Sequence, residues 1–399
     1  MVRPGRSGCI SRVPIPASPT WRSSTTVTDS PASDPNRAAA ILTIDLAALA
    51  ANYRLLATTA APARCAAVVK ADAYGLGIDV AAPALEAAGA RDFFVAQLEE
   101  GIALRALLPE ARIAILNGLA PGCEADYAVH RLLPVLNHPG EIEAWHGFAR
   151  KTGERQHAFL HIDTGMNRLG LGAGELDRLA AHPDLLAGID IDLVMSHFAC
   201  ADEAANPMTA AQAATFQAAR GRLPKAPASI ANSSGIFRGA AYALDLVRPG
   251  CALYGVNPTP EAANPMRPVV RLEARILQLR DVDSPMTVGY GATFRVARPT
   301  KIATIAMGYA DGYLRSLSGR GEVWVAGTRA PLVGRVSMDL VTIDVTDVAE
   351  ADAQPGALVE VIGPHRDVDA IARDAGTIGY EVLTALGQRY ARRTVGAAA

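Results

Sequence analysis

The chain has 399 residues, half of them apolar, which is enough to bury a large core and to build two domains. Its formal net charge is −2, with both signs spread along the sequence, and this excludes the electrostatic footprint of a protein that binds nucleic acid or an anionic membrane. We therefore expect a small polar or zwitterionic molecule as the partner.

The cysteines and the apolar runs indicate the compartment. The five cysteines are odd in number, widely separated and without metal-ligand spacing, which argues against a disulfide framework and against a zinc site. No apolar run reaches the roughly 18 to 20 residues that a membrane span needs, and none near the start is typical of a signal peptide. We expect a cytoplasmic protein with no bound metal.

The first part of the chain divides into a polar tail and a first pair of elements. Residues 1–38 are rich in Pro, Ser, Thr and Arg and have no apolar period, so we predict a disordered N-terminal extension. Order is expected to begin with a short strand at 41–44. Asp45 then caps a helix whose apolar stripe begins at Leu46.

From residue 65 the chain repeats one pattern: a short apolar run, a polar or glycine-containing loop, and an Ala- and Leu-rich helical stretch. This pattern is typical of βα units around a parallel sheet. Eight such units over about 200 residues predict a (β/α)8 barrel, TIM-like, spanning residues 39–265. The predicted strands are 65–69, 92–96, 112–116, 132–136, 158–163, 193–197, 228–232 and 244–247.

The last third of the chain has a different pattern, with β-prone runs separated by turn residues and few helical intervals. We predict a C-terminal, mainly antiparallel β domain over residues 266–399, which the strand at 41–44 is a candidate to join. Its predicted strands are 269–279, 301–307, 322–326, 340–345 and 358–362, and its predicted helices are 367–374 and 380–386.

Lys70 directly follows the first barrel strand. Active sites of such barrels lie at the carboxyl ends of the strands, where burial lowers the pKa of a lysine and suits its amine to a Schiff base or to proton transfer. A lone lysine at a strand end is more often a rim residue whose amine reaches solvent. Two turns change that interpretation, Asn232-Ser233 and Gly250-Cys251. They follow the last strands of the barrel, and turns at this place in a barrel commonly bind phosphate. A phosphate-bearing aldehyde held by a lysine predicts pyridoxal 5'-phosphate as the cofactor.

A series of short motifs carries a family resemblance from about residue 41 to residue 394. The motifs are Ala67-Val-Val-Lys-Ala-Asp-Ala-Tyr-Gly75, Asp163-Thr-Gly-Met-Asn-Arg168, Ser196-His197, Ala231-Asn-Ser233, Val247-Arg-Pro-Gly250, Gly289-Tyr-Gly291, Gly308-Tyr-Ala-Asp-Gly312, Ser337-Met-Asp339 and Gly379-Tyr-Glu381. In this order they resemble alanine racemase, a pyridoxal phosphate enzyme of fold type III.

The resemblance implies a two-base racemisation. Removal of the Cα proton leaves a planar carbanion, so an acid/base group is needed on each face. Lys70 would serve the face of the D-enantiomer. Tyr290 of the partner subunit would serve the other face, which makes a homodimer with active sites at the subunit interface necessary for catalysis.

The resemblance also implies the remaining contacts. Arg248 would meet the pyridine nitrogen and leave it without a proton, which limits side reactions such as transamination, and His197 would pack on the ring and link Arg248 to Tyr290. Arg168 would contact the cofactor and the substrate, and Met338 and Tyr309 would shape the substrate pocket. The residues implied to hold the phosphate end are Tyr74, Asn232, Ser233, Gly250, Cys251 and Tyr380.

One position departs from the family pattern. Many members carry a lysine two residues before the Asp-Thr-Gly motif, modified to an anionic carbamate that orients the arginine, and this chain has His161 there. Taken alone, His161 is more typical of a hydrogen-bonded core histidine than of a ligand. We hypothesise that a chloride ion, another carboxylate or nothing replaces the carbamate beside Arg168.

The expected function is interconversion of L-alanine and D-alanine, which supplies D-alanine for peptidoglycan of the cell wall or degrades it. The alternatives are a broader racemase acting on serine or basic amino acids, and a cofactor-binding homeostasis protein without turnover. Homeostasis proteins of that kind resemble only the barrel, so the β domain that carries Tyr290 argues against this alternative. Arg248 disfavours a decarboxylase, since the related decarboxylases use an acidic residue at the ring nitrogen.

Overall fold

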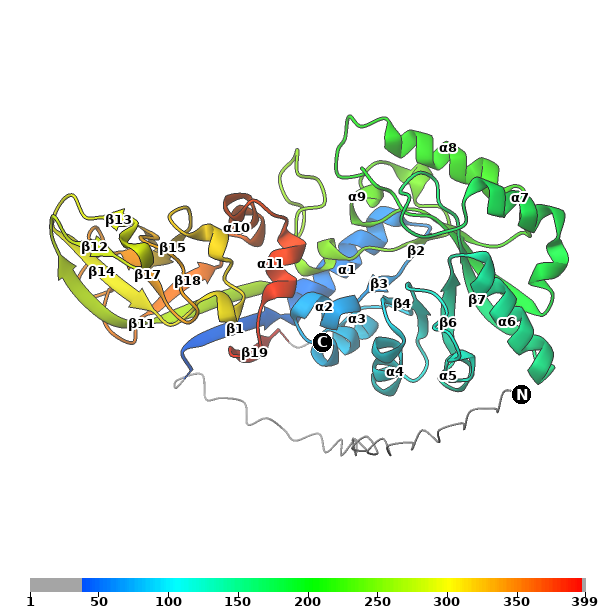
Figure 1. Cartoon of the computed structure of the whole chain (residues 1–399), viewed down its shortest axis with the longest axis horizontal. Helices are drawn as coiled ribbons and strands as arrows, with labels where there is room; N and C mark the ends of the chain where they lie inside the picture. Colours follow the sequence, from blue (N-terminus) through cyan, green and yellow to red (C-terminus); the bar gives the residue numbers. More distant parts are fainter. Residues whose placement is uncertain (1–37, 397–399) are drawn as a thin grey trace, which may run out of the picture.

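The apolar runs between residues 64 and 247 form a parallel barrel, and the β-prone runs after residue 269 form a separate antiparallel sheet beside it (Figure 1). This arrangement comes from a computed structural model that describes residues 38–396. The expectation for the N-terminal extension falls almost entirely on residues 1–37, outside the described part. Within 38–396, every helix is too short or too polar to span a bilayer.

The barrel strands lie in chain order, and the seven between Ala67 and Ser229 are each hydrogen-bonded in parallel to the next. They are β2 (Arg64–Cys65), β3 (Ala67–Val68), β4 (Asp92–Val95), β5 (Arg112–Ile115), β6 (Leu132–Leu136), β7 (Gln156–His161), β8 (Ile189–Met195), β9 (Ala228–Ser229) and β10 (Leu246–Val247). β3 to β9 form one seven-stranded sheet, and β10 pairs with β2. A hydrogen bond from the Asp245 amide to the Ala228 carbonyl (3.1 Å) joins the segment before β10 to β9, so the sheet closes.

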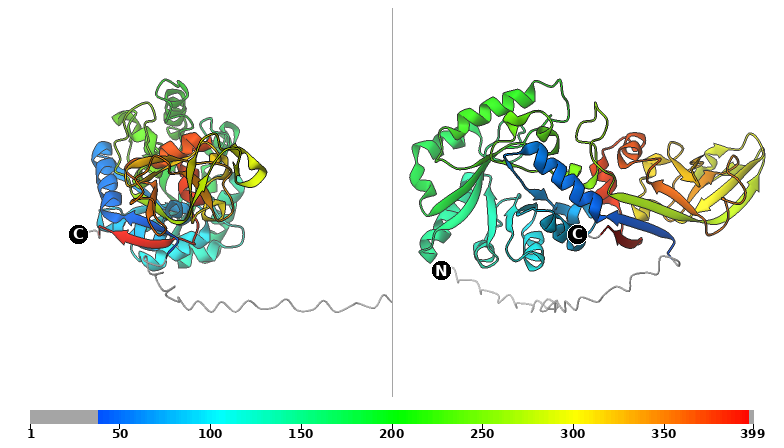
Figure 2. Two further views of the ribbon diagram at one scale, coloured as in Figure 1. Left: turned by 90° about the vertical axis from the view of Figure 1, so that its left-hand side faces the viewer. Right: turned by 180° about the vertical axis from the view of Figure 1, so that it is seen from behind.

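The helices of this half lie around the outside of the barrel (Figure 2). They are α1 (Leu46–Ala60), α3 (Ile78–Ala87), α4 (Leu98–Leu107), α5 (Glu124–Val129), α6 (Pro139–Thr152), α7 (Ala173–Ala181), α8 (Met208–Arg220) and the short α9 (Ser233–Ile236). The Asp45 side chain accepts the Ala48 amide at 2.9 Å and caps α1. Leu49, Tyr53 and Leu56 are buried, so the predicted stripe is the packed face of this helix.

The C-terminal sheet has the order β16-β15-β18-β11-β1-β19, and β14 and β17 pair beside it. Its strands are β1 (Ala40–Asp45), β11 (Val270–Val282), β14 (Thr300–Ile305), β15 (Glu322–Val325), β16 (Thr328–Pro331), β17 (Val341–Asp344), β18 (Leu358–Ile362) and β19 (Ala391–Val395), and β12 (Thr287–Val288) and β13 (Phe294–Arg295) form a separate hairpin. The first strand of the chain pairs antiparallel with β11 and parallel with β19. The sheet therefore contains both ends of the described chain.

The predicted fold class, a barrel followed by an antiparallel β domain, is confirmed, whereas four short strands were not predicted. β12 and β13 have two residues each, and β16 and β19 are rich in polar residues. In the other direction, the predicted strands at 228–232 and 244–247 shorten to two residues each, and the first barrel strand is interrupted at Ala66.

Helices α10 (Val368–Ala375) and α11 (Gly379–Ala385) stand between the two halves (Figure 1). α11 lies beside α2 (Lys70–Gly75), the turn that follows the first barrel strand. Arg392 of β19 donates to the Gly75 carbonyl at 2.9 Å. These contacts bring the C-terminal part of the chain to the carboxyl ends of the barrel strands, where a cavity opens.

Candidate active site

A cavity of about 560 Å³ lies at the carboxyl ends of the barrel strands, between the barrel and α11. Most of the residues that border it lie at the ends of barrel strands or in the loops that follow them, so side chains far apart in the sequence meet there. All ten residues expected to bind the cofactor line this cavity: Lys70, Tyr74, Arg168, His197, Asn232, Ser233, Arg248, Gly250, Cys251 and Tyr380.

The turn after Lys70 is left-handed. Ala71, Asp72, Ala73 and Tyr74 have φ values of 54, 53, 52 and 58°, although none of them is glycine. Each such residue costs about 1–2 kcal/mol relative to right-handed geometry, so specific contacts must hold the turn. The Ala71 amide donates to Glu100 at 2.6 Å, and the Ala73 amide donates to the Val69 carbonyl at 2.9 Å. This turn places Lys70 and Tyr74 on the same cavity.

Lys70 is half-buried, and its surroundings favour the neutral amine. Burial lowers its pKa, the positive charge of Arg168 lowers it further, and the Glu100 carboxylate acts in the opposite direction. A lowered pKa leaves more of the amine in its neutral form near neutral pH, and the neutral amine is the form that attacks an aldehyde or accepts a proton. Lys70 is therefore suited both to form a covalent bond with an aldehyde and to exchange a proton.

Ser233 and Gly250 form a small cradle at one end of the cavity. The Ser233 hydroxyl accepts the amides of Gly250 (2.9 Å) and Ala252 (3.3 Å). A Cβ atom at position 250 would lie 2.2 Å from the Tyr74 hydroxyl, so only glycine leaves room here. Tyr74 itself stacks on Tyr254, with ring centroids 4.7 Å apart. The cradle gathers amide and hydroxyl groups of the kind that bind phosphate.

The side chains of Cys251 and Tyr380 meet beside this cradle. The Cys251 thiol lies 2.9 Å from the Tyr380 hydroxyl and donates to it. Burial is the main cause that raises the pKa of both groups, so both are neutral at physiological pH. Tyr380 belongs to α11, so this contact links the C-terminal half of the chain to the end of the cavity that holds the Ser233–Gly250 cradle.

Arg248 is completely buried at the other end of the cavity. Its guanidinium donates to the Ser196 carbonyl (2.5 Å), to the Ser229 hydroxyl and to His197 Nδ1 (3.4 Å). Burial lowers the pKa of Arg248 to about 9, which still leaves it protonated at neutral pH. Burial and the positive charge of Arg248 together hold the pKa of His197 well below its usual value. The site therefore presents one buried cation beside one neutral imidazole.

His161 is buried, as expected of a core histidine, but it also lines the cavity. Its Nδ1 lies 2.8 Å from the Asn137 amide oxygen, and the Asn137 amide nitrogen donates to the Val135 carbonyl at 2.8 Å. The oxygen of Asn137 must therefore face the ring, so His161 carries a proton on Nδ1. Burial lowers the pKa of His161 to about 4, which keeps it neutral beside Arg168.

Three expected site residues lie outside this cavity. Tyr290, Tyr309 and Met338 belong to the C-terminal domain, and 72%, 42% and 54% of their respective surfaces are exposed. Tyr290 opens the short helix η4 (Tyr290–Ala292), and Tyr309 opens η5 (Tyr309–Asp311). These side chains do not reach the cavity of their own chain, so a single chain brings together only part of the expected site.

The residues of this cavity suit a phosphate-bearing aldehyde, and the similarity of the chain to known proteins agrees with that. Sequence models for the alanine racemase N-terminal and C-terminal domains match residues 44–258 and 269–394. The chain belongs to the alanine racemase family. Among curated members, the chain is 51% identical to the alanine racemase of Brucella abortus over 369 residues, covering 89% of this chain and 93% of that protein. It is 53% identical to that of Acidiphilium cryptum over 351 residues, covering 88% and 97%.

Solved structures of alanine racemases share the fold. The alanine racemase of Bartonella henselae, solved with covalently bound pyridoxal phosphate, is 44% identical, with a TM-score of 0.87 over 90% of this chain and all of that chain. The biosynthetic alanine racemase of Pseudomonas aeruginosa is 37% identical, with a TM-score of 0.83 over 90% of this chain and 99% of that one. These matches confirm the family predicted from the sequence motifs.

Two features of this family member were missed from its sequence. Glu100 contacts the lysine turn, and Arg389 binds both Asp311 (2.6 and 2.8 Å) and Asp339 (2.7 Å). Arg389 thereby joins the two loops that carry Tyr309 and Met338. Each contact joins positions far apart in the chain. Only correlated substitutions across many related sequences could have revealed them, and a single sequence contains no such correlation.

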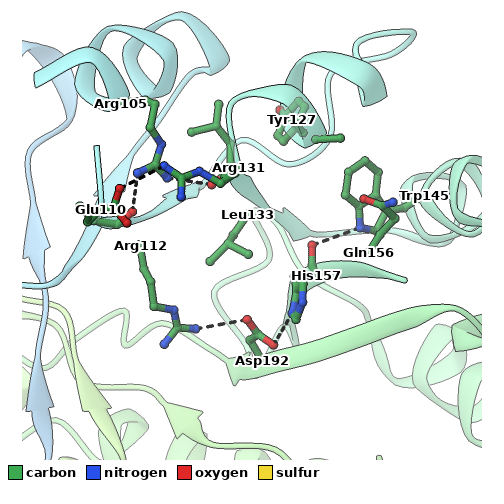
Figure 3. Close-up of a pocket in the computed structure, with 13 residues that line it drawn as sticks. Arg105, Glu110, Arg112, Tyr127, Arg131, Leu133, Trp145, Gln156, His157 and Asp192 are labelled. Carbon is green, nitrogen blue, oxygen red and sulfur yellow. Dashed lines mark hydrogen bonds and ion pairs between the residues drawn. The ribbon is translucent and has the colours of Figure 1, made fainter. Parts of the chain in front are cut away.

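A second cavity, of about 390 Å³, lies at the opposite end of the barrel, where the strands begin (Figure 3). Its charged side chains are already paired with protein groups. Asp192 binds Arg112 at 3.4 Å and His157 at 3.0 Å, and Arg105 donates to the His130 carbonyl at 2.9 Å. Because these charged groups already have partners within the protein, this cavity does not compete with the first as a site for catalysis.

Proposed function

We propose that this alanine racemase interconverts L- and D-alanine with pyridoxal 5'-phosphate held at Lys70, by a two-base mechanism. The observation that carries the proposal is that Lys70, Arg248 and the Ser233–Gly250 cradle share one cavity. When bound, pyridoxal phosphate withdraws electrons from the substrate and stabilises the negative charge left on Cα.

The Ser233–Gly250 cradle at one end of the cavity would hold the phosphate. The hydroxyls of Tyr74, Ser233 and Tyr380 supply donors, and the absence of a side chain at Gly250 lets the Tyr74 hydroxyl lie against this turn. The Cys251 thiol orients the Tyr380 hydroxyl. These neutral donors suit a dianionic phosphate.

Arg248 would face the ring nitrogen of the bound cofactor. Because the guanidinium is a donor without a lone pair and stays protonated at neutral pH, it gives the ring nitrogen no proton and moderates its electron withdrawal. Lower electron withdrawal limits the leakage of substrate into transamination. His197, which is neutral and contacts Arg248, would pack on the cofactor ring.

Two groups exchange the Cα proton, one on each face. Lys70 removes or returns the proton on the face of the D-enantiomer, and its lowered pKa suits both directions. By the family resemblance, Tyr290 of the partner subunit serves the opposite face, and this agrees with the 72% exposure of Tyr290 and its absence from the cavity of its own chain. The enzyme is therefore a homodimer with active sites at the subunit interface, where Tyr309 and Met338 shape the substrate pocket.

The environment of Arg168 differs from that of relatives with a carbamylated lysine. The imidazole of His161 is neutral and forms no stable carbamate. We keep the hypothesis that a chloride ion, another carboxylate or nothing takes its place. A crystal soaked in bromide would reveal an anion beside Arg168 by anomalous scattering, and a carbamylated lysine at that position would refute the hypothesis.

We also propose the cellular setting and the division of the chain. The buried thiols of Cys65 and Cys251 are unpaired, which fits the reducing cytoplasm. The domains divide as a barrel of residues 39–265 and a β domain of residues 266–399. The pairing of β1 with β11 supports counting the first strand with the second domain.

The experiment that tests the function incubates the purified, cofactor-loaded protein with each L-amino acid and measures the D-product by chiral chromatography. We expect rapid formation of D-alanine, and Lys70→Ala should abolish it together with the visible absorbance of the bound cofactor. Fast turnover of serine or a basic amino acid without any D-alanine would overturn the assignment of the substrate.

A further inference from the structure

Glu100 lies in the first turn of α4, and its carboxylate accepts three backbone hydrogen bonds. Oε2 accepts the amides of Ala96 (2.7 Å) and Gln97 (3.0 Å), which lie between β4 and α4. Oε1 accepts the amide of Ala71 at 2.6 Å, and Ala71 directly follows Lys70. One side chain therefore ties the end of the second barrel strand to the turn that carries the lysine.

The first two contacts belong to a helix cap, whereas the third does not. A glutamate at this position of a helix commonly accepts the amide of the capping residue, here Gln97. The contact with Ala71 instead crosses to another strand, at the start of the left-handed turn. Both oxygens are needed, and only a carboxylate supplies two acceptors, because the side-chain amide of glutamine has a single acceptor oxygen.

Glu100 also contributes charge at the lysine. The charged groups that face Lys70 are Arg168, from the loop after β7, and Glu100, from α4. His197, which follows β8, is neutral. Burial and Arg168 oppose protonation of Lys70, and the carboxylate of Glu100 acts against them.

We infer that Glu100 is a positioning residue for Lys70, which holds the backbone of the lysine turn at the cavity and places a carboxylate beside that turn. The consequence for racemisation rests on the proposed function. The contacts themselves belong to this chain, so they can be tested without turnover.

The chain has only four lysines, Lys70, Lys151, Lys225 and Lys301, which permits a direct titration. The full chain, stripped of cofactor, is labelled with trace acetic anhydride across a range of pH, and the acetylation of each lysine is read by peptide mass spectrometry. In Glu100→Gln the midpoint of Lys70 should move to lower pH by about 0.5–1 unit, while the other three lysines keep theirs.

Glu99→Gln is the matched control, because Glu99 is the exposed neighbour in the same helix turn. It removes the same charge from the chain and should leave the Lys70 midpoint unchanged. Glu100→Asp keeps the charge with a shorter side chain, so its midpoint should lie closer to that of the wild type than that of Glu100→Gln. It also serves as the test variant if Glu100→Gln does not fold.

Kinetics of the loaded enzyme give a second readout. A weaker base at Lys70 slows proton removal from D-alanine, so Glu100→Gln should raise the primary isotope effect of Cα-deuterated D-alanine more than that of Cα-deuterated L-alanine. An unshifted Lys70 midpoint in folded Glu100→Gln would overturn the inference and leave Glu100 as a helix cap. A wild-type enzyme without racemase activity would instead refute the proposed function, while the titration would still decide the role of Glu100.

Discussion

The Arg248 guanidinium and the His197 imidazole are joined by a contact of 3.4 Å between Nη2 and Nδ1. Arginine has no acceptor, so the direction of donation is fixed and the lone pair of Nδ1 must face it. His197 is therefore a neutral ring that carries its proton on Nε2. The pair presents a cation and an uncharged aromatic ring to the same cavity, which is the arrangement on which the proposed control of the cofactor depends.

Replacing Arg248 by glutamine should change what the enzyme makes as well as how fast it works. Without this cation beside it, the ring nitrogen becomes more basic and takes up a proton from solvent. The protonated ring would withdraw more electrons, so more substrate would be diverted to transamination. Racemisation should fall about 100-fold or more, as expected when a preorganised electrostatic contact is removed. Chromatography of the released cofactor would show pyridoxamine phosphate accumulating with turnover.

Arg238→Gln is the control for this experiment, since Arg238 donates to the Ala201 carbonyl and lies outside the cavity. It should accumulate no more pyridoxamine phosphate than the wild type. If Arg248→Gln racemised alanine as fast as the wild type and diverted no substrate to transamination, the assigned role of Arg248 would be wrong.

Removing the thiol of Cys251 should weaken the binding of cofactor. In Cys251→Ala the Tyr380 hydroxyl loses a donor at 2.9 Å, so the dissociation constant for pyridoxal phosphate should rise about 2- to 10-fold, the range for one hydrogen bond. Titration of the stripped protein, followed by absorbance, measures this constant. Cys200→Ala is the matched control, because Cys200 contacts Met208 and does not line the cavity. An equal loss in both variants would contradict the account.

The buried histidine at position 161 should make stability depend on pH. Its pKa is about 4 in the folded chain against an ordinary value of 6.5, so the unfolded chain binds the proton first as the pH falls. The corresponding stability, about 3 kcal/mol, is present above pH 6.5 and is lost as the pH falls toward 4.

His161→Gln removes this titration, so between pH 7.5 and pH 4 it should lose about 3 kcal/mol less than the wild type. Urea denaturation at a series of pH values, with each protein compared to its own value at pH 7.5, gives the difference. His197 is present in both proteins, so its contribution cancels. Parallel curves for the two proteins would show that His161 does not titrate as described.

The sequence was sufficient to predict the barrel and the identity of its mouth residues, because apolar runs of strand length recur and each is followed by a chemically distinctive turn. It was insufficient at the left-handed turn. Ala71 and Ala73 carry no glycine-like signal, and the conformation is held by Glu100, a partner 29 positions away from Ala71. The strand β19 was likewise missed, since Arg392 and Arg393 alternate poorly and the strand forms by pairing with β1.

Tyr290 illustrates the other limit of a single chain. Its motif identifies it as an acid/base group by resemblance, whereas the structure leaves it exposed in the C-terminal domain, away from Lys70. A site shared between subunits cannot be completed by local pattern or by the fold of one chain. The central claim is that the partner supplies this tyrosine.

Subunit complementation tests that claim most directly. Lys70→Ala and Tyr290→Phe are each expected to be almost inactive, and a mixed dimer would pair the Lys70 of one subunit with the Tyr290 of the other at one of its two sites. Co-expression in equal amounts should therefore restore racemisation to about a quarter of the wild-type rate, by statistical pairing in a symmetric dimer. Dimers that form with both variants and recover no activity would contradict a tyrosine acting across the interface.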